Sequence, residues 1–416
     1  MYRTSKNEFL RAVQDNREFT AIIKPTTRCN LACSYCSVWE KNNLKMPIEM
    51  MEKILISTTG YMQKNLGEKS SLLAVFHGGE PLLMGHEYYE DTFKILNGLR
   101  DKGYSIQPHF QTNATLINKR YIEIFLNNGC DISISLDGPE MIHDAQRHTK
   151  NNHGSYKSVI NGLKQLQEAN IQPWVCAVIR KDSIENLIGI YEHMKELKIK
   201  NLFFGFLYPS GDGRNVQSEL GIEEEVWTKS LIKLYEYWLN DPTRIPNIEP
   251  INRIMFNLEG KKNIGCNASR CVSRVVGFMP DGGVYPCAVL TGVEEFNYGN
   301  INNDNLEDIL NCQVRTNLLT RHNKLDNKCR SCDFVSFCRG NCMHLSYTIN
   351  KNAESLGAFC ERDLFSYIEK TILERDIFRP IDKVSIIERK YKNKQFVASL
   401  PPIKDSDAKK YRLKVI

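Results

Sequence analysis

The 416-residue sequence has no long hydrophobic run. No stretch approaches the roughly 18 consecutive apolar residues that a membrane-spanning helix requires. The first residues, MYRTSKNEFLRAVQDNREF, lack the apolar segment of a secretory signal peptide. Long internal repeats and low-complexity tracts are missing as well. We therefore expect a cytoplasmic protein with no membrane partner.

A general excess of basic charge is also missing. Residues 381–416 hold ten Lys and Arg against four Asp and Glu, which accounts for the whole net charge of +6. The rest of the chain is neutral, so a basic surface built for nucleic acid is not indicated. The basic end could attract an acidic peptide, but a solvated and partly flexible C-terminus is an equally good interpretation.

Cysteine, by contrast, is abundant. The chain has 14 cysteines, of which three lie at 29–36 and nine lie between 266 and 360. In a reducing cytosol a disulfide framework is not expected. Dense thiols in that setting indicate metal or redox chemistry.

Apolar runs alternate with longer amphipathic segments between residues 20 and 206. The runs that we predict as strands are 20–26, 72–78, 108–113, 131–137, 174–179 and 201–206. The helices expected between them are 48–63, 88–100, 118–129, 156–170 and 184–198. Such repetition is typical of βα units around a parallel sheet. The predicted fold class is α/β, a partial (β/α)6 TIM-like barrel, with a doubly wound sheet as the alternative.

The pattern changes after residue 206. A Gly-rich loop, YPSGDGRN, precedes a helix-like segment and the Pro-rich linker DPTRIPNIEP. The following cysteine-rich region has short elements and many turns, so metal is expected to hold it together. We predict five segments: 1–19, N-terminal; 20–225, partial barrel; 226–265, bridging helix and linker; 266–365, cysteine-rich domain; 366–416, C-terminal helix and basic tail.

The first cysteine group reads TTRCNLACSYC, with Cys29, Cys33 and Cys36. It follows the first predicted strand, where the active face of a βα barrel lies. Three thiolates cannot complete a four-coordinate structural zinc site. They can hold three irons of a [4Fe–4S] cluster and leave the fourth iron open for catalysis.

This motif, with Tyr35 before its third cysteine, resembles the signature of the radical S-adenosylmethionine (SAM) superfamily. The resemblance implies that SAM binds the open iron of a cluster held by Cys29, Cys33 and Cys36. It also implies reductive cleavage of SAM to methionine and a 5′-deoxyadenosyl radical. A zinc knuckle or a group of unrelated thiols is the alternative.

Four further motifs fit the same resemblance: FHGGEPLL, QTNATL, SISLDGP and HDAQR. Adjacent glycines permit close backbone approach to a ligand, and a glutamate can accept from an ammonium group. The family uses the GGE segment for the amino group of SAM and an arginine for its carboxylate. The cofactor-binding residues so implied are Tyr35, Gly78, Gly79, Glu80, Asn113, Ser135, Asp137 and Arg147. For Asn113, Asp137 and Arg147, a structural role at a strand end is an equal alternative.

The second cysteine group contains C-RS-C-DFVSF-C-RGN-C. It resembles the SPASM domain, and the upstream VGFMPDGGVYPC reads as a hairpin with a DGG turn. The interleaved ligation of that family implies two auxiliary [4Fe–4S] clusters. Cluster I takes Cys266, Cys271, Cys287 and Cys342, and cluster II takes Cys329, Cys332, Cys338 and Cys360. Two zinc sites are the alternative.

The resemblance covers roughly residues 20–365. Enzymes with SPASM domains largely act on ribosomally made peptides or on protein side chains. The spacing from Cys329 to Cys360 is similar to the anaerobic sulfatase-maturing group, which forms formylglycine. In that group an Asp follows the hairpin cysteine and serves as the base, whereas Ala288 follows Cys287 here, and Asp281 is no obvious substitute.

We therefore predict a peptide maturase that forms a C–C cyclophane or thioether crosslink. The alternatives are a formylglycine-type sulfatase maturase, a peptide epimerase, a radical SAM enzyme acting on a small molecule, and a non-catalytic metal-binding protein. Expected partners are a precursor peptide or protein substrate and an electron donor such as flavodoxin or ferredoxin. The catalytic candidates are Tyr208, Asp212 and Arg214, in a loop for which an ordinary turn is the alternative interpretation.

Overall fold

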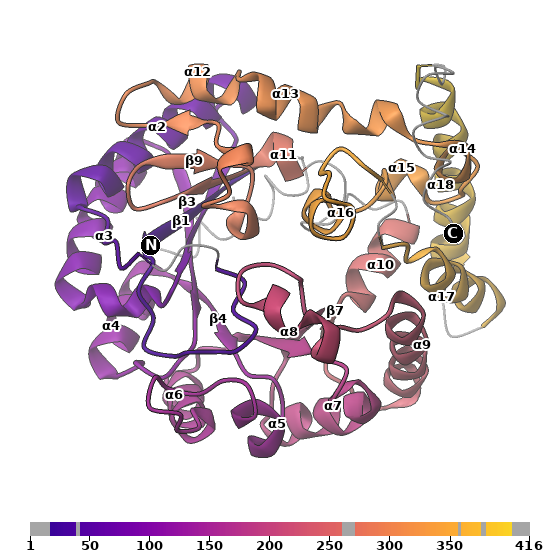
Figure 1. Cartoon of the computed structure of the whole chain (residues 1–416), viewed down its shortest axis with the longest axis horizontal. Coiled ribbons are helices and arrows are strands. Elements are labelled where there is room, and N and C mark those ends of the chain that lie inside the picture. The colour runs from indigo at the N-terminus through magenta and orange to yellow at the C-terminus, as the bar shows by residue number, and fades with distance from the viewer. Residues whose placement is uncertain (1–16, 39–41, 260–270, 357–358, 376–379, 402–416) are drawn as a thin grey trace. The chain divides into compact units, whose positions relative to one another are not determined.

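Strands and helices alternate through the first half of the chain, as Figure 1 shows. The computed structural model describes residues 17–38, 42–259, 271–356, 359–375 and 380–401. The strands are β1 (Glu18–Thr26), β2 (Ser71–Gly78), β3 (Ser105–Thr112), β4 (Asp131–Ser135), β5 (Trp174–Ile179), β6 (Asn201–Phe206), β7 (Asn247–Glu249), β8 (Val275–Phe278), β9 (Gly283–Tyr285) and β10 (Gly299–Asn300).

The helices fall into two sets. Those up to residue 258 are α2 (Ile48–Leu66), α3 (His86–Asp101), α4 (Lys119–Asn128), α5 (Glu140–Asp144), α6 (Tyr156–Glu168), α7 (Leu187–Glu196), α8 (Gly213–Leu220), α9 (Glu224–Asn240) and α10 (Ile251–Leu258). Those that follow are α11 (Cys271–Arg274), α12 (Leu306–Leu310), α13 (Gln313–Leu319), α14 (Asn327–Arg330), α15 (Val335–Cys338), α16 (Met343–Asn350), α17 (Arg362–Glu374) and α18 (Pro380–Ala398). Short 3₁₀ turns are η1 (Pro81–Met84), η2 (Ile184–Asn186), η3 (Ala288–Leu290), η4 (Glu294–Phe296) and η5 (Arg321–Lys324).

The sheet decides between the two predicted folds. Its strand order is β10-β9-β8-β1-β2-β3-β4-β5-β6-β7, and every pair from β1 to β7 is parallel. A doubly wound sheet reverses its strand order, whereas right-handed crossovers between sequential strands place all helices on one face. The predicted α/β partial barrel is therefore confirmed, and each of the six predicted strands is present.

The burial pattern along the strands shows which face the helices cover. On β2, Leu72, Ala74 and Phe76 are fully buried, whereas the alternate residues Val75 and His77 are partly accessible. Because side chains alternate between the faces of a strand, one face of the sheet packs against the helices and the other lines the inside of the barrel. Figure 1 shows α2, α3, α4 and α6 along the outer side of the strands.

Local sequence explains the helix ends. The Asn118 side chain accepts from the backbone N–H of Tyr121 and so caps α4, which then ends at Gly129 with a φ of 64°. The amide oxygen satisfies one of the free N–H groups of the first turn, and glycine adopts the left-handed conformation without a steric penalty. The predicted helix over 118–129 is thus confirmed.

The predicted hairpin is confirmed by the antiparallel pair β8 and β9. The backbone N–H of Met279 donates to the carbonyl of Gly283 (2.9 Å), and Gly282 has a φ of 89°. Strand β8 also pairs in parallel with β1. The hairpin therefore extends the barrel sheet beyond its first strand.

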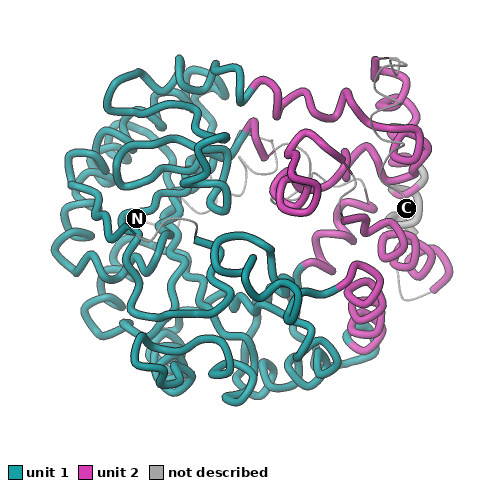
Figure 2. Tube along the Cα trace, viewed as in Figure 1, with its two compact units in different colours: residues 1–222, 238–249, 274–315 teal, residues 223–237, 250–273, 316–416 magenta. Residues whose placement is uncertain are grey.

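The chain divides into two compact units that are interleaved in sequence (Figure 2). Unit 1 contains residues 1–222, 238–249 and 274–315, and unit 2 contains residues 223–237, 250–273 and 316–416. Within unit 2, α10, α17 and α18 pack together around buried Leu364, Ile368 and Ile386. None of the helices in the described ranges is long and apolar enough to cross a membrane.

Candidate active site and auxiliary cysteine sites

The loop after β1 carries Cys29, Cys33 and Cys36. The backbone N–H of Leu31 donates to Cys29 Sγ (3.4 Å), and that of Cys36 donates to the Cys33 carbonyl (3.2 Å). Burial, with smaller contributions from the neighbouring charges of Glu80, Cys33 and Cys36, raises the pKa of the Cys29 thiol to about 12. The three thiols therefore lie close enough to interact electrostatically.

Two other segments hold this cysteine loop through backbone hydrogen bonds. The N–H groups of Ala32 and Ser34 donate to the carbonyls of His148 (2.8 Å) and Gln146 (3.1 Å). The N–H of Asp212, in the loop after β6, donates to the Cys36 carbonyl (2.8 Å). The predicted HDAQR motif and the YPSGDGRN loop thus both lie directly beside the cysteines.

Gly78 and Gly79 pack against the backbone that leads into Cys29. A Cβ at Gly79 would lie 2.0 Å from the carbonyl oxygen of Arg28, and one at Gly78 would lie 2.4 Å from that of Thr26. The N–H of Glu80 also donates to the Arg28 carbonyl (2.8 Å). The sequence predicts a close backbone approach at these two glycines. In the structure, the atoms that they approach belong to the protein's own backbone at Thr26 and Arg28.

Glu80 is fully buried, and its carboxylate joins the ends of β2 and β3. It accepts from the N–H of Leu82 (3.0 Å), the hydroxyl of Thr112 (2.7 Å) and the N–H of Asn113 (2.7 Å). Burial raises its pKa to about 7 although these three hydrogen bonds oppose the shift. A carboxylate has about four acceptor positions, so one remains for a further donor.

Asn113 connects β3 to the cysteine loop. Its side-chain amide donates to Asn30 Oδ1 (2.8 Å) and approaches Cys29 Sγ (3.8 Å), and its oxygen accepts from the hydroxyl of Thr115 (2.7 Å). The Asn30 amide in turn donates to the same Thr115 hydroxyl (2.8 Å). These amide contacts set the position of the backbone around Cys29.

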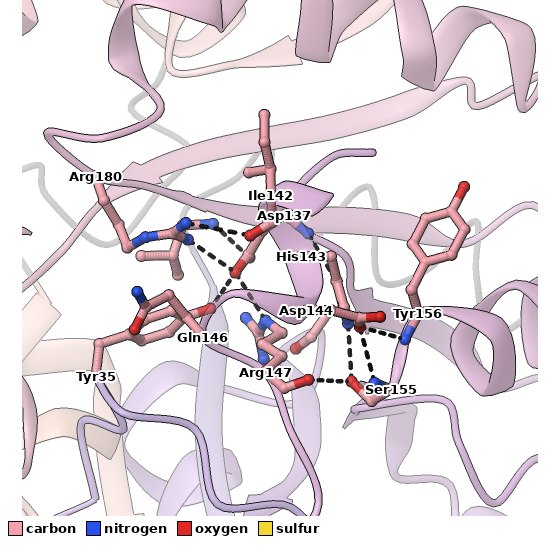
Figure 3. Close-up of polar contacts among 12 residues, drawn as sticks. Tyr35, Asp137, Ile142, His143, Asp144, Gln146, Arg147, Ser155, Tyr156 and Arg180 are labelled. Atoms are coloured by element: carbon pink, nitrogen blue, oxygen red, sulfur yellow. Dashed lines mark hydrogen bonds and ion pairs between the residues drawn. The ribbon is translucent and has the colours of Figure 1, made fainter. Parts of the chain in front are cut away.

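A second buried group, the Asp137 cluster, contains Tyr35, Asp137, His143, Arg147 and Arg180 (Figure 3). Asp137 Oδ2 pairs with Arg147 Nε (3.1 Å) and Arg180 Nη1 (3.5 Å) and accepts from the Tyr35 hydroxyl. Both guanidinium carbons lie over the Tyr35 ring, at 5.3 and 5.7 Å from its centroid.

The charge states of the Asp137 cluster follow from these contacts. Burial opposes ionisation of Asp137, but Arg147, His143 and the hydrogen bonds outweigh it and lower the pKa of the carboxyl. Burial lowers the pKa of His143 to about 4. The neutral ring accepts from the N–H of Asp137 (3.3 Å) and faces the Ser155 hydroxyl (2.9 Å). Arg147 also lowers the pKa of Cys33, against a larger increase from burial.

Arg180 was not among the residues predicted from the sequence. It directly follows β5, is 1% exposed, and also pairs with Asp182 (3.1 Å). The available signal was a charged residue immediately after the apolar run WVCAVI, at the same sheet edge as the other motifs. His143 was missed as well, although it belongs to the predicted HDAQR segment.

The remaining predicted residues lie near this site with weaker contacts. Ser135, at the end of β4, accepts from the Gln111 amide (3.4 Å) on the inner face of the barrel. Arg214 Nε donates to the Gly211 carbonyl (3.1 Å), and the Tyr208 ring lies 4.9 Å from that of Phe206. A catalytic role for Tyr208, Asp212 and Arg214 stays a prediction.

Four cysteines of unit 2 line one cavity of about 150 Å³: Cys329, Cys332, Cys338 and Cys360. Burial, with smaller contributions from the charges of Glu361 and Cys360, raises the pKa of Cys338 to about 12. Apolar neighbours such as Phe334, Phe359 and Phe365 complete the lining. Four thiolates around a cavity of this kind fit the ligand set of a [4Fe–4S] cluster.

The other predicted set is divided between the two units. Cys271 and Cys342, in unit 2, line a small pocket of about 20 Å³. Cys287 is buried and belongs to unit 1, and Cys266 lies outside the described residues. All cysteines in the described ranges are free thiols. Within those ranges, no three His, Cys, Asp or Glu side chains have the spacing of a single metal-ion site.

Family models match both cysteine regions. The radical SAM superfamily model matches residues 23–197, and SPASM, described as an iron-sulfur cluster-binding domain, matches residues 266–333. The cysteine-type anaerobic sulfatase-maturating enzyme of Clostridium novyi is 26% identical over 362 residues, which are 86% of this chain and 96% of the relative. The serine-type enzyme of Bacteroides thetaiotaomicron is 25% identical over 339 residues, 77% of this chain and 81% of the relative.

Solved structures share the fold. Native anSMEcpe with bound AdoMet and Cp18Cys peptide has a TM-score of 0.75 at 20% identity, covering 88% of this chain and 99% of its own. Streptococcus suis SuiB bound to precursor peptide SuiA has a TM-score of 0.58 at 18% identity, covering 85% of this chain and 78% of its own. The chain therefore carries a radical SAM domain followed by a SPASM domain, and is a radical SAM enzyme that uses SAM and [4Fe–4S] clusters.

Proposed function

We propose that this enzyme is a maturase that oxidises one side chain of a protein or peptide substrate in the manner of a sulfatase maturase. The observation that carries the proposal is the extent of the similarity to the Clostridium novyi enzyme, 86% of this chain and 96% of the relative. It supports the formylglycine-type alternative over the crosslinking reaction that we predicted first.

In this proposal Cys29, Cys33 and Cys36 hold the catalytic cluster. When bound, the reduced cluster and SAM supply a 5′-deoxyadenosyl radical that removes a hydrogen atom from the substrate. The acceptor position left on Glu80 suits the ammonium group of SAM, because its other positions are already occupied. Arg147 suits the carboxylate of SAM, since a guanidinium binds carboxylates in a fixed geometry.

The other members of the Asp137 cluster then act as positioning residues. Asp137 has no exposed surface, and Tyr35 is 7% exposed, so both are engaged within the protein. Their contacts restrain the guanidinium of Arg147, whose side chain is 11% exposed. Restraint of this kind lowers the entropy cost of orienting a cofactor.

The eight SPASM cysteines complete the proposal as ligands of two auxiliary clusters. The cavity lined by Cys329, Cys332, Cys338 and Cys360 supports one of them. For the other, the pocket beside Cys271 and Cys342 supports half of the ligand set. Flavodoxin or ferredoxin as the electron donor stays a prediction.

A second candidate is peptide crosslinking, and one observation favours it. Ala288 follows Cys287 at the position where the sulfatase-maturing group has the Asp that serves as its catalytic base. Asp281 does not replace that group, because it is exposed and its carboxylate accepts from the N–H of Gly283 (3.0 Å) within the hairpin turn. A reaction that needs no base at this position would explain the difference.

Anaerobic turnover on peptides separates these functions. The purified enzyme would be incubated with SAM, a low-potential reductant, and a sulfatase-derived peptide that carries Cys, Ser or Ala at the target position. Mass spectrometry and hydrazide trapping would then detect an aldehyde. We expect an aldehyde on the Cys or Ser peptide and no change on the Ala peptide.

Each of the other possible products would indicate a different function. Loss of two hydrogens without an aldehyde would assign the enzyme to crosslinking. Deuterium uptake from heavy water at unchanged connectivity would assign it to epimerisation. Formation of 5′-deoxyadenosine with every peptide unmodified would contradict a polypeptide substrate and would direct the search to small molecules.

A further inference from the structure

Arg321, the first residue of η5 in unit 2, is a buried cation with no carboxylate partner in the described part of the chain. It is 8% exposed. Its Nη1 donates to the Asn341 carbonyl (2.6 Å), and its Nη2 donates to the Ser355 carbonyl (2.6 Å) and the Ser346 hydroxyl (3.1 Å). These three acceptors are neutral, so the charge itself is not compensated.

The guanidinium also has an unused donor. Arg321 Nε is buried and has no hydrogen-bond partner in the described residues. Leaving a charged donor buried without a hydrogen-bond partner is costly in free energy. The Arg321 Nε–H is therefore available to a hydrogen-bond acceptor in the adjoining pocket.

The groups around Arg321 that can become negative are cysteines. As thiolates, Cys342 and Cys271 interact with the guanidinium most strongly, followed by Cys338 and Cys329. Arg321, Cys271 and Cys342 line one pocket. Asn341 lines both this pocket and the 150 Å³ cavity of the other four cysteines. Arg321 is thus adjacent to members of both predicted ligand sets.

We propose that Arg321 is the counter-charge of the auxiliary clusters and that its Nε–H donates a hydrogen bond to a sulfur atom of the cluster bound by Cys271 and Cys342. This inference rests on the proposed SPASM ligation. Cluster potentials depend on net charge and on hydrogen bonds to sulfur. A fixed cation stabilises the more negative, reduced state, so Arg321 raises the reduction potential of the nearby cluster.

The test uses the full chain with Cys29, Cys33 and Cys36 replaced by Ala, so that iron signals come only from auxiliary sites. Into this parent we would introduce Arg321→Gln, Arg321→Lys or, as a control, Arg315→Gln. Arg315 is also buried, at 7% exposure, and donates to the Leu310 carbonyl (2.7 Å). Iron content and potentiometric titration followed by electron paramagnetic resonance would be measured for each.

We expect the midpoint potential of the cluster bound by Cys271 and Cys342 to be the same in the parent and in Arg315→Gln. Arg321→Gln should shift it to a more negative value, and Arg321→Lys should give an intermediate shift because the charge remains but the Nε–H is lost. A midpoint of Arg321→Gln equal to that of the parent would overturn the inference. If Arg321→Gln binds no iron, the same comparison is made with Arg321→Lys, and an unshifted midpoint would again overturn it.

If the proposed auxiliary ligand sets are wrong, the experiment gives a different result. A parent variant that folds but binds no iron at all would refute the proposed auxiliary ligand sets, and the role of Arg321 with them. If the parent binds iron and the Arg321 variants have the same midpoint potential as the parent, only the role of Arg321 is refuted.

Discussion

A single buried carboxylate, Asp137, pairs with two buried arginines at the edge of the barrel. Arg147 and Arg180 are 9% and 1% exposed, and both pair with Asp137 Oδ2. Asp137 also accepts from the hydroxyl of Tyr35, in the cysteine loop. This one carboxylate therefore links the cysteine loop to Arg147 and to Arg180, which follows β5.

Asp137→Asn should destabilise the protein by about 3–5 kcal/mol, because removing one partner leaves buried charge without compensation. The measurement is anaerobic denaturant unfolding. Asp182→Asn is the matched control, since Asp182 pairs with the same Arg180 but its side chain is 41% exposed. Exposed pairs contribute about 0–1 kcal/mol. Equal losses in the two variants would contradict this account of Asp137.

Gly79→Ala should disturb the cysteine loop directly. The added Cβ would lie 2.0 Å from the Arg28 carbonyl oxygen, so the backbone beside Cys29 must shift. We expect a loss of about 1–3 kcal/mol of stability, as for other overpacked sites, and a lower iron content. Gly98→Ala in α3 is the control, since nothing lies within 4 Å of its added Cβ. Wild-type iron content in Gly79→Ala would show that the glycine is not required.

At the scale of elements, α18 holds the auxiliary cysteine segment in unit 2. Arg389 donates to the Asp333 carbonyl (2.6 Å), and the Asn393 side chain donates to the Cys332 carbonyl (3.1 Å) and accepts from the N–H of Ser336 (2.8 Å). Residues four apart lie on the same face of a helix, so α18 presents both side chains together. The described part of the basic C-terminal region is thus packed helix, although a solvated end was an equal expectation.

Asn393→Ala should weaken this auxiliary site. It removes both hydrogen bonds to the segment between Cys332 and Ser336, which we expect to cost about 1–3 kcal/mol. The readout is the rate of iron release to a chelator from the intact protein. Gln395→Ala, at an exposed position of the same helix, should release iron at the wild-type rate. Identical rates in the two variants would exclude this role of α18.

At the scale of the whole molecule, the three cysteines after β1 belong to unit 1, whereas the cavity cysteines Cys329, Cys332, Cys338 and Cys360 belong to unit 2. Cys332→Ala should therefore leave SAM cleavage intact while reducing iron content and peptide turnover. Chromatographic assay of 5′-deoxyadenosine, with peptide mass spectrometry in the same reaction, measures both activities. Loss of SAM cleavage in Cys332→Ala would show that the two sites depend on each other.

Much of this organisation could be predicted from the sequence. Each strand is a short apolar run, and parallel strands bring their carboxyl ends to one edge, so Glu80, Asn113 and Asp137 were expected beside the cysteine loop. The pairing of β8 with β1 could not be predicted, because it joins segments about 250 residues apart. Arg180 and Arg321 were missed because a lone arginine gives no signal until tertiary packing shows what surrounds it.

The most direct test of the central claim is the amount of 5′-deoxyadenosine that Cys29→Ala forms from SAM under reducing, anaerobic conditions. Cys312→Ala, which changes a cysteine outside the predicted ligand sets, is the control. We predict no 5′-deoxyadenosine from Cys29→Ala and wild-type amounts from Cys312→Ala. Retained SAM cleavage in Cys29→Ala would contradict the assignment of Cys29, Cys33 and Cys36 as the catalytic cluster site.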